Sequence, residues 1–222
     1  MPPFPTESTS LLLPGLAGAL ELACALPDAG VARAGVAVIS HPHPLQGGTM
    51  TNKVVTTLER TLLDLGFTTV RHNFRGVGRS EGAHADGIGE TDDLVAIARW
   101  AMAQRAGDAL WLAGFSFGSY VTLRAAGELD ARQLILIAPP VGRWDFAAIA
   151  APACPWLIVQ GEADEVVDAE AVFAWAAALQ PPQTVIRLPD TGHFFHRKLI
   201  DLRDAVKNAV SAALPPRRDG HA

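Results

Sequence analysis

The sequence has few cysteines, little excess charge and no long uninterrupted apolar run. Its two cysteines, Cys24 and Cys154, lie in apolar stretches without metal-binding spacing, so we predict buried, reduced thiols rather than a disulfide. The formal net charge of -5 gives no electrostatic basis for binding nucleic acid or an anionic membrane. No segment approaches the ~18 consecutive apolar residues of a membrane-spanning helix. The composition therefore argues against a disulfide scaffold, a nucleic-acid-binding protein and a membrane protein.

The start of the chain also lacks basic residues. Residues 1–10 contain neither Lys nor Arg, and Glu21 interrupts the apolar run that begins at Leu11. A secretory signal peptide instead has a positively charged start followed by an unbroken apolar centre. We therefore predict that this segment forms a first β-hairpin and that the protein is cytoplasmic.

The length and the apolar content suit one α/β domain. The chain has 222 residues, of which 49% are hydrophobic, and this is enough to bury a full core. Neither an internal repeat nor an interdomain linker is visible, so residues 1–222 are predicted to form a single domain with its core at residues 11–214. Two prolines follow the last predicted helix, and residues 215–222 are predicted to form a disordered tail.

Strands and helices alternate along the rest of the chain. The predicted hairpin comprises residues 11–13 and 19–26. Apolar runs of strand length follow at residues 36–40, 67–72, 109–113, 133–137, 156–160 and 184–188. Segments with helical character lie at residues 49–65, 88–104, 120–126, 166–179 and 194–214. This alternation indicates an α/β fold with a mostly parallel central sheet and helices on both faces.

The most informative segment is Gly114-Phe115-Ser116-Phe117-Gly118, which lies between a predicted strand and a predicted helix. A Gly-x-Ser-x-Gly in this context is typical of a nucleophile elbow, a strained turn that exposes the serine at the edge of the sheet. Side chains at the two glycine positions would collide with the neighbouring strand and helix. The sequence therefore predicts that Ser116 is a nucleophile.

A serine nucleophile needs a histidine to take its proton and an acid to orient that histidine. Asp164 follows the predicted strand 156–160, and His193 lies in the loop after the last predicted strand, 184–188. Both side chains should reach the carboxyl edge of the parallel sheet, where catalytic groups gather. We therefore predict that Ser116, His193 and Asp164 form a catalytic triad.

Other residues compete for two of these roles. Asp164 could be a turn residue or a helix N-cap, but Asp168 precedes Ala-Glu-Ala-Val and is the better N-cap candidate. Asp190 lies too close to His193 in the sequence to be the first choice for the acid. His196 is the nearest rival of His193, and we predict that it lies in the first turn of the final helix and faces solvent.

An oxyanion hole commonly uses the N–H after the nucleophile and another from the loop after an earlier strand. Phe117 supplies the first donor. The second is expected after the predicted strand 36–40, in a loop whose two prolines have no N–H, and His43 is the first choice and Leu45 the second. His41 and His43 have no accompanying cluster of Cys or carboxylate residues, so no metal site is predicted. The proposed chemistry needs no cofactor.

The order Ser116, Asp164, His193 along the chain differs from that of other serine-triad folds and resembles the α/β-hydrolase superfamily. The resemblance covers nearly the whole chain, residues 11–214. It implies the α/β-hydrolase fold, which places helices on both faces of a mostly parallel sheet with an antiparallel N-terminal hairpin.

Two further segments carry this resemblance. The sequence His41-Pro-His-Pro-Leu-Gln-Gly-Gly-Thr-Met-Thr-Asn-Lys-Val-Val resembles the signature of a group of small bacterial, lidless α/β-hydrolases. The segment Asn73-Phe74-Arg75-Gly76-Val77-Gly78-Arg79-Ser80 is similar to the Asp-x-Arg-Gly-x-Gly-x-Ser loop of many members. Asn73 replaces the usual Asp, so this position carries no charge here.

The connection between the predicted strands 133–137 and 156–160 is short. A cap domain is commonly inserted at this point in the superfamily, but residues 138–152 are too few to form one. We therefore predict an open site without a cap domain. Trp144 and Phe194 are the candidates for walls of the substrate pocket.

The leading hypothesis is a serine hydrolase that cleaves carboxylic esters or thioesters of small or solvent-exposed substrates through an acyl-enzyme. One alternative is an amide or peptide hydrolase, for which Arg75 and Arg79 are weak candidates to anchor a peptide terminus. Another is a non-catalytic binding protein of the same fold, against which the complete triad argues. The substrate is expected to be a small molecule, and the sequence predicts no oligomeric state.

Overall fold

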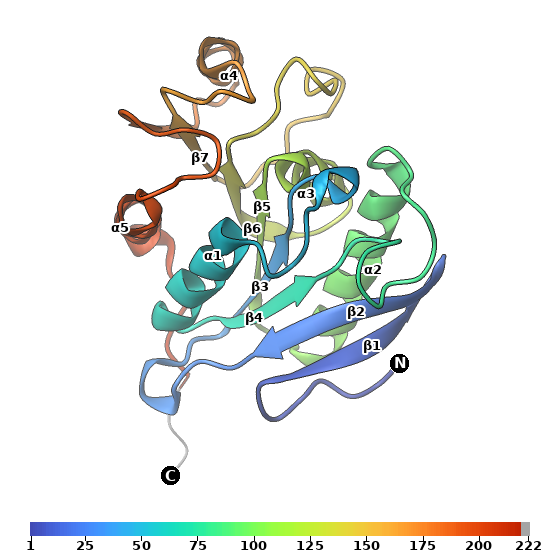
Figure 1. Ribbon diagram of the computed structural model, residues 1–222. Coiled ribbons are helices and arrows are strands. Elements are labelled where there is room, and N and C mark those ends of the chain that lie inside the picture. The colour runs from blue at the N-terminus through green and yellow to red at the C-terminus, as the bar shows by residue number, and fades with distance from the viewer. Residues whose placement is uncertain (219–222) are drawn as a thin grey trace.

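The computed structural model describes residues 1–218, and its centre is one eight-stranded sheet (Figure 1). The strands are β1 (Thr9–Gly15), β2 (Gly18–Ala25), β3 (Gly35–Ser40), β4 (Thr68–His72), β5 (Ala109–Phe115), β6 (Ala131–Ile137), β7 (Trp156–Gly161) and β8 (Thr184–Leu188). Their order across the sheet is β1-β2-β4-β3-β5-β6-β7-β8. β1 and β2 form an antiparallel hairpin, β2 pairs antiparallel with β4, and all pairs from β4 to β8 are parallel. The predicted fold class is confirmed.

Helices cover both faces of this sheet. They are α1 (Lys53–Asp64), α2 (Ile88–Gln104), α3 (Phe117–Ala126), α4 (Ala169–Ala177) and α5 (Leu199–Val210), with short 3₁₀ turns η1 (Ala29–Val31), η2 (Pro44–Gln46) and η3 (Ser211–Ala213). Figure 1 shows α1 and α5 on one side of the sheet, while α2 and α3 lie on the other. The sheet therefore separates two apolar layers, each covered by helices.

Strand β5 shows how the sequence creates these layers. Leu110 and Leu112 are buried among the apolar residues of α2 and α3, whereas Trp111, Ala113 and Phe115 are buried on the side of α1 and α5. Successive side chains of a strand point to opposite faces, so a continuous apolar run is what a strand covered on both sides requires. Burial of each such leucine contributes about 1.5–3 kcal/mol to folding.

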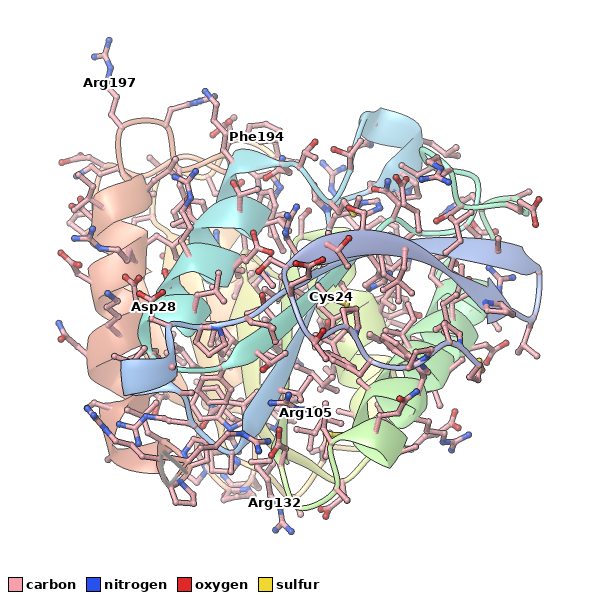
Figure 2. All side chains as sticks on the ribbon, turned by 90° about the horizontal axis from the view of Figure 1, so that it is seen from below. Cys24, Asp28, Arg105, Arg132, Phe194 and Arg197 are labelled. Atoms are coloured by element: carbon pink, nitrogen blue, oxygen red, sulfur yellow. The ribbon has the colours of Figure 1, made fainter. Side chains whose placement is uncertain are left out.

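The parallel strands end at one edge, and their carboxyl-end loops carry the predicted site residues. Figure 2 shows that Phe194, from the loop after β8, lies at the opposite end of the molecule from Arg132, the second residue of β6. Arg105, just after α2, also lies toward the Arg132 end. The candidate site therefore belongs to the edge that open parallel sheets use for ligands.

The segment after β8 differs from its predicted helix at residues 194–214. Phe195 and Arg197 have φ values of 52° and 61°, which a right-handed helix does not allow. The N–H of Lys198 donates to the Phe195 carbonyl at 2.9 Å and closes a turn, so α5 begins only after it. This turn buries the Phe195 side chain completely. His196 lies in the turn rather than in the helix, although it is exposed as expected.

The predicted tail is ordered where the structure describes it, so that prediction is wrong for residues 215–218. Arg33 donates from Nη1 to the Pro215 carbonyl at 2.7 Å, and Arg217 forms an antiparallel bridge with Arg33. The guanidinium of Arg218 pairs with the buried Asp108 carboxylate. These contacts give the polar segment the partners that its composition alone does not reveal. Residues 219–222 lie outside the described residues.

Two helix boundaries depend on capping side chains. The predicted helix 49–65 begins only at Lys53, because Asn52 accepts a hydrogen bond from the Val54 N–H at 2.9 Å and acts as its N-cap. Asp168 accepts from the N–H of Glu170 at 3.0 Å and caps α4, as predicted.

Both cysteines are free thiols. Cys24 is buried in β2, as predicted, and burial raises its pKa to about 12. Cys154 is only half-buried and lies in the connection before β7, so the prediction of a buried thiol is wrong at this position. Within residues 1–218, no helix has both the length and the apolar character required to cross a bilayer.

Candidate active site

Ser116 occupies the turn between β5 and α3. Its φ of 54° and ψ of −121° are unusual for any residue other than glycine. A Cβ at Gly114 would collide with the backbone of Gly118, and a Cβ at Gly118 would lie 2.5 Å from the Ser40 carbonyl oxygen at the end of β3. Only glycine fits at these two positions, and the local geometry is that of a nucleophile elbow.

The structure brings together the three residues that the sequence singled out. Ser116 Oγ lies 3.0 Å from His193 Nε2, and His193 Nδ1 lies 2.9 Å from Asp164 Oδ2. Because an ionised carboxylate only accepts hydrogen bonds, the proton of neutral His193 is on Nδ1. Nε2 is then free to accept from the serine hydroxyl. The arrangement is that of a Ser-His-Asp triad.

Asp164 is held by more than His193. Its Oδ1 accepts from the N–H groups of Val166 at 2.9 Å and Val167 at 2.7 Å, and its Oδ2 also accepts from Gln160 Nε2 at 2.9 Å. Burial would raise the pKa of Asp164, but the hydrogen bonds from His193 and Val167 outweigh it and hold the pKa below its usual range. The carboxyl group is therefore an anion at neutral pH with both oxygens fixed.

The competing acid and histidine lie outside this arrangement. Asp190 is an exposed turn residue with a φ of 50° and makes no hydrogen bond to His193 in the described part of the chain. The exposed ring of His196 packs on Phe194 with the centroids 6.0 Å apart. Neither side chain is therefore placed to replace Asp164 or His193.

Two contacts hold the buried His193 ring and its backbone. The ring packs on Phe115, with the centroids 5.1 Å apart. The His193 N–H donates to Glu165 Oε2 at 3.1 Å. Phe115 belongs to the elbow and Glu165 to the loop that carries the acid, so the loops after β5, β7 and β8 are locked to one another.

The loop after β3 approaches the elbow closely. The N–H of Leu45 donates to His43 Nδ1 at 3.2 Å and is therefore already engaged. Within residues 1–218, the N–H groups of His43 and Phe117 have no acceptor. Burial, reinforced by neighbouring His84, lowers the pKa of His43, so its ring is neutral and its Nδ1 can accept.

His41 has a structural role at the start of this loop. Its Nδ1–H donates to the Pro42 carbonyl at 2.6 Å, and its Nε2 accepts from the Phe74 N–H at 2.9 Å. Burial lowers the pKa of His41 to about 4. With both ring nitrogens occupied, His41 has no lone pair for a metal ion. Within the described residues, no three His, Cys, Asp or Glu side chains gather closely enough to hold one.

Aromatic rings border the site on two sides. Trp144 packs on Phe117 and on the ring of His43, with centroid separations of 5.2 and 5.6 Å. Phe194 lies edge-on to His193 at 5.1 Å and remains 43% exposed. Both rings are thus beside the residues predicted to carry the chemistry, and Phe194 is open to solvent at the rim.

Sequence reasoning missed Gln160 and Glu165, which support the acid and the histidine. Gln160 is completely buried at the end of β7, where every other residue of the strand is apolar or glycine. A single polar side chain at the carboxyl end of such a strand is the signal that could have pointed to it. Glu165 lies among several acidic residues of one loop, and the sequence offers no signal that distinguishes it from them.

Comparison with known proteins agrees with this geometry. The family model described as X-Pro dipeptidyl-peptidase (S15 family) matches residues 19–152, more than half of the chain. The structure of an α/β serine hydrolase without a lid from Xanthomonas campestris is 52% identical, with a TM-score of 0.95 over 98% of this chain and 100% of that one. An α/β serine hydrolase homologue from Coxiella burnetii is 45% identical, with a TM-score of 0.88 over 92% and 99% of the two chains.

A protein from Rickettsia prowazekii, described as uncharacterized, is 32% identical over 78% of this chain and 77% of its own. The fold and the three hydrogen-bonded side chains define an α/β hydrolase. The chain belongs to the α/β serine hydrolases, within the family described as X-Pro dipeptidyl-peptidase (S15 family). That family description names a peptidase, whereas the Xanthomonas protein is described only as a serine hydrolase.

Proposed function

We propose that this protein hydrolyses carboxylic esters or thioesters of small or solvent-exposed substrates through an acyl-enzyme. The observation that carries the proposal is the continuous hydrogen-bond chain from Ser116 through His193 to Asp164. Each member of that chain has a hydrogen-bond partner that fixes its orientation, which a binding protein of the same fold would not need. The likeness to a lidless relative also supports our inference that the segment from His41 to Val55 marks a lidless group.

In the proposed reaction, Ser116 Oγ attacks the carbonyl carbon while His193 Nε2 takes its proton. The proton on Nε2 then passes to the leaving alcohol or thiol as the bond to it breaks. Water repeats the sequence on the acyl-serine and releases the acid. Throughout, Asp164 holds the Nδ1 proton and stabilises the imidazolium that forms.

The oxyanion donors in this proposal are the N–H groups of Phe117 and His43. Both lack a protein acceptor within residues 1–218, and the ring of His43 packs on that of Phe117 with the centroids 4.9 Å apart. Leu45 was the second choice from the sequence. Its N–H is bonded to His43 Nδ1, so we assign the donor role to His43.

The proposed substrates are short or exposed because residues 1–218 form no cap domain over the site. The connection between β6 and β7 forms turns without a helix or strand of its own, and its Trp144 lies against Phe117 and His43. Phe194 on the other side offers one partly exposed ring. A long acyl chain would extend into water beyond these two rings and gain little from apolar burial.

The second candidate is a peptidase that acts after proline, and the family match favours it. The sequence suggested Arg75 and Arg79 as anchors for a peptide terminus, and a guanidinium can pair only with the C-terminal carboxylate, not with the N-terminal ammonium group. Arg75 is unsuited to this role because its guanidinium makes a two-point pairing with the buried Asp93, at 2.7 and 2.8 Å. Arg79 is exposed, and its backbone N–H donates to Glu21 Oε2.

Initial rates on matched chromogenic substrates separate the two candidates. We expect hydrolysis of p-nitrophenyl acetate and butyrate that is abolished in the Ser116→Ala variant, with no release of p-nitroaniline from Gly-Pro-p-nitroanilide. Faster turnover of the anilide than of either ester would replace the ester proposal with the peptidase. Equal rates for wild type and Ser116→Ala on all three would remove both.

A further inference from the structure

The loop after β3, which supplies the proposed donor His43, is held at both ends by β4 and the segment that follows it. At its start, the N–H of Phe74 donates to His41 Nε2 at 2.9 Å. At its far end, the N–H of Met50 donates to Asn73 Oδ1 at 2.9 Å, and the Met50 carbonyl accepts from Arg71 Nη1 at 2.7 Å. Two adjacent residues, 73 and 74, thus hold the two ends of the loop.

Asn73 has a second partner that fixes its orientation. Its Nδ2 donates to Glu21 Oε2 at 2.8 Å, and the same oxygen accepts from the Arg79 N–H at 2.8 Å. Asn73 is only 5% exposed, and Gly78 lies so close to it that a Cβ there would collide with both Asn73 and Glu21. The amide therefore has little freedom to move away from these partners.

This pair of contacts explains why the position holds asparagine. Met50 N–H requires an acceptor, and the Glu21 carboxylate requires a donor, so the side chain between them must offer both. An aspartate would meet the first need and not the second, because ionised it only accepts. It would also place a second negative charge at the position of a hydrogen-bond donor to Glu21.

We propose that Asn73 is a positioning residue for the oxyanion hole. Its side chain links the Met50 N–H to the Glu21 carboxylate on strand β2 and so fixes the loop that carries the donor. This inference rests on the ester-hydrolase function proposed above. The Met50 end and the His43 end of the loop are coupled, because the Gly48 N–H donates to the His43 carbonyl at 3.0 Å. A shift at Met50 is thereby passed to the donor.

The loop has no spare room to absorb such a shift. A Cβ at Gly48 would collide with the Pro42 carbonyl oxygen, so the two sides of the loop are already in contact. The elbow packs equally closely against the start of the loop, because a Cβ at Gly118 would lie 2.6 Å from the His41 carbonyl oxygen. Displacing a catalytic group by about 1 Å can lower the rate on the order of a hundredfold.

The test compares one substitution at two positions. Asn73→Asp removes the side-chain donor to Glu21. Asn52→Asp is the control, because the Asn52 side chain only accepts from the Val54 N–H as the N-cap of α1, and an aspartate accepts equally well. With p-nitrophenyl acetate, we expect Asn73→Asp to lower kcat by about tenfold to a hundredfold with KM changed less than about threefold, because an oxyanion donor acts mainly on the transition state. Asn52→Asp should match the wild type in both constants.

A compensating variant distinguishes positioning from a general loss of stability. In Asn73→Asp combined with Glu21→Gln, the amide introduced on β2 can donate to the aspartate and removes the like-charge contact, although the Arg79 N–H then loses its acceptor because both bonds use Oε2 of Glu21. We expect this double variant to recover most of the lost kcat. Recovery without a change in melting temperature would not follow from a merely structural role.

Amide hydrogen exchange provides a readout that needs no activity. The Met50 amide should exchange faster in Asn73→Asp than in the wild type and regain protection in the double variant. An unprotected Met50 amide in the wild type, or unchanged kcat and unchanged protection in Asn73→Asp, would overturn the inference. An inactive wild type with the expected exchange pattern would instead refute the ester-hydrolase proposal and leave the Asn73 anchor of the loop standing.

Discussion

Replacing the triad acid by its amide is the perturbation whose outcome the structure defines best. In Asp164→Asn, the orientation of the new amide is fixed by Val166 and Val167, whose N–H groups both donate to Oδ1. The amide oxygen must stay with them, so the NH2 group faces His193 Nδ1. That nitrogen can then only accept, and the imidazole proton moves to Nε2.

A proton on Nε2 disables the serine. His193 Nε2 lies 3.0 Å from Ser116 Oγ and in this tautomer donates to it, so it cannot take the hydroxyl proton. The wrong tautomer lowers kcat by about 10³- to 10⁴-fold in serine-triad enzymes, which corresponds to about 4–5 kcal/mol of transition-state stabilisation. We expect a loss of this size here because the two backbone donors leave the amide no alternative orientation.

The variant should nevertheless fold. Gln160 Oε1 is buried without a partner within the described residues, so a turn of the Gln160 amide would let this oxygen accept from the new NH2, at the loss of the bond from Gln160 Nε2 to the Gly161 carbonyl. The assay is kcat for p-nitrophenyl acetate, with the melting temperature measured in parallel. Asp190→Asn is the matched control, and as an exposed residue outside the triad it should lose less than about twofold. A larger loss for Asp190→Asn than for Asp164→Asn would show that the acid lies on the loop after β8.

Three further predictions follow from the site and its surroundings. Rates on p-nitrophenyl esters should peak at short acyl chains, from acetate to butyrate, because each methylene adds about 0.8 kcal/mol only where a wall buries it; an optimum at long chains would require a cover over the site. Burial lowers the pKa of His72 to about 3 from 6.5. Below pH 6.5 the unfolded chain therefore binds a proton at His72 that the folded chain does not bind, and the free energy of unfolding should fall by about 2 kcal/mol per such histidine between pH 6.5 and 5. Chemical denaturation at both pH values should therefore show a smaller loss for His72→Gln than for the wild type, and an equal loss would contradict the burial argument. Gly118→Ala should abolish activity or soluble expression, because its Cβ would meet the Ser40 and His41 carbonyl oxygens, and a fully active variant would show that the elbow can relax.

The triad could be located from the sequence because each member follows a buried strand of a parallel sheet. Ser116 lies directly after β5, and Asp164 and His193 lie in the loops that follow β7 and β8. Parallel strands bring their carboxyl ends to one edge, so residues that are far apart in the chain become neighbours without any knowledge of side-chain contacts. The alternation of strand and helix patterns predicted the fold class, and the interrupted apolar segment near the start of the chain predicted the antiparallel hairpin.

Features that depend on single tertiary contacts could not be predicted in this way. The final helix begins late because burial of Phe195 imposes a positive φ. Residues 215–218 are ordered through Arg33 and Asp108, which lie more than a hundred residues away in the sequence. The sequence already ranked His43 before Leu45 as an oxyanion donor, but the hydrogen bond that engages the Leu45 N–H is visible only in the structure. Local composition carries no information about such partners.

Asn73 illustrates the same limit at the level of one side chain. In the sequence it is only a departure from the aspartate that many members of the superfamily carry. Its need for a donor becomes apparent once Glu21 is seen opposite it, 52 residues away, with Met50 on the other side. A substitution at one position can thus be understood only together with the residue that faces it.

The most direct test of the central claim is the intact mass of the protein after exposure to a fluorophosphonate probe. We predict one covalent adduct per chain, mapped to Ser116 by peptide sequencing, and none on Ser116→Ala. Asp164→Asn should label far more slowly than the wild type, because the probe requires the same activated hydroxyl. Absence of an adduct on the folded wild-type protein, or equal labelling of Ser116→Ala, would contradict the assignment of Ser116 as the nucleophile.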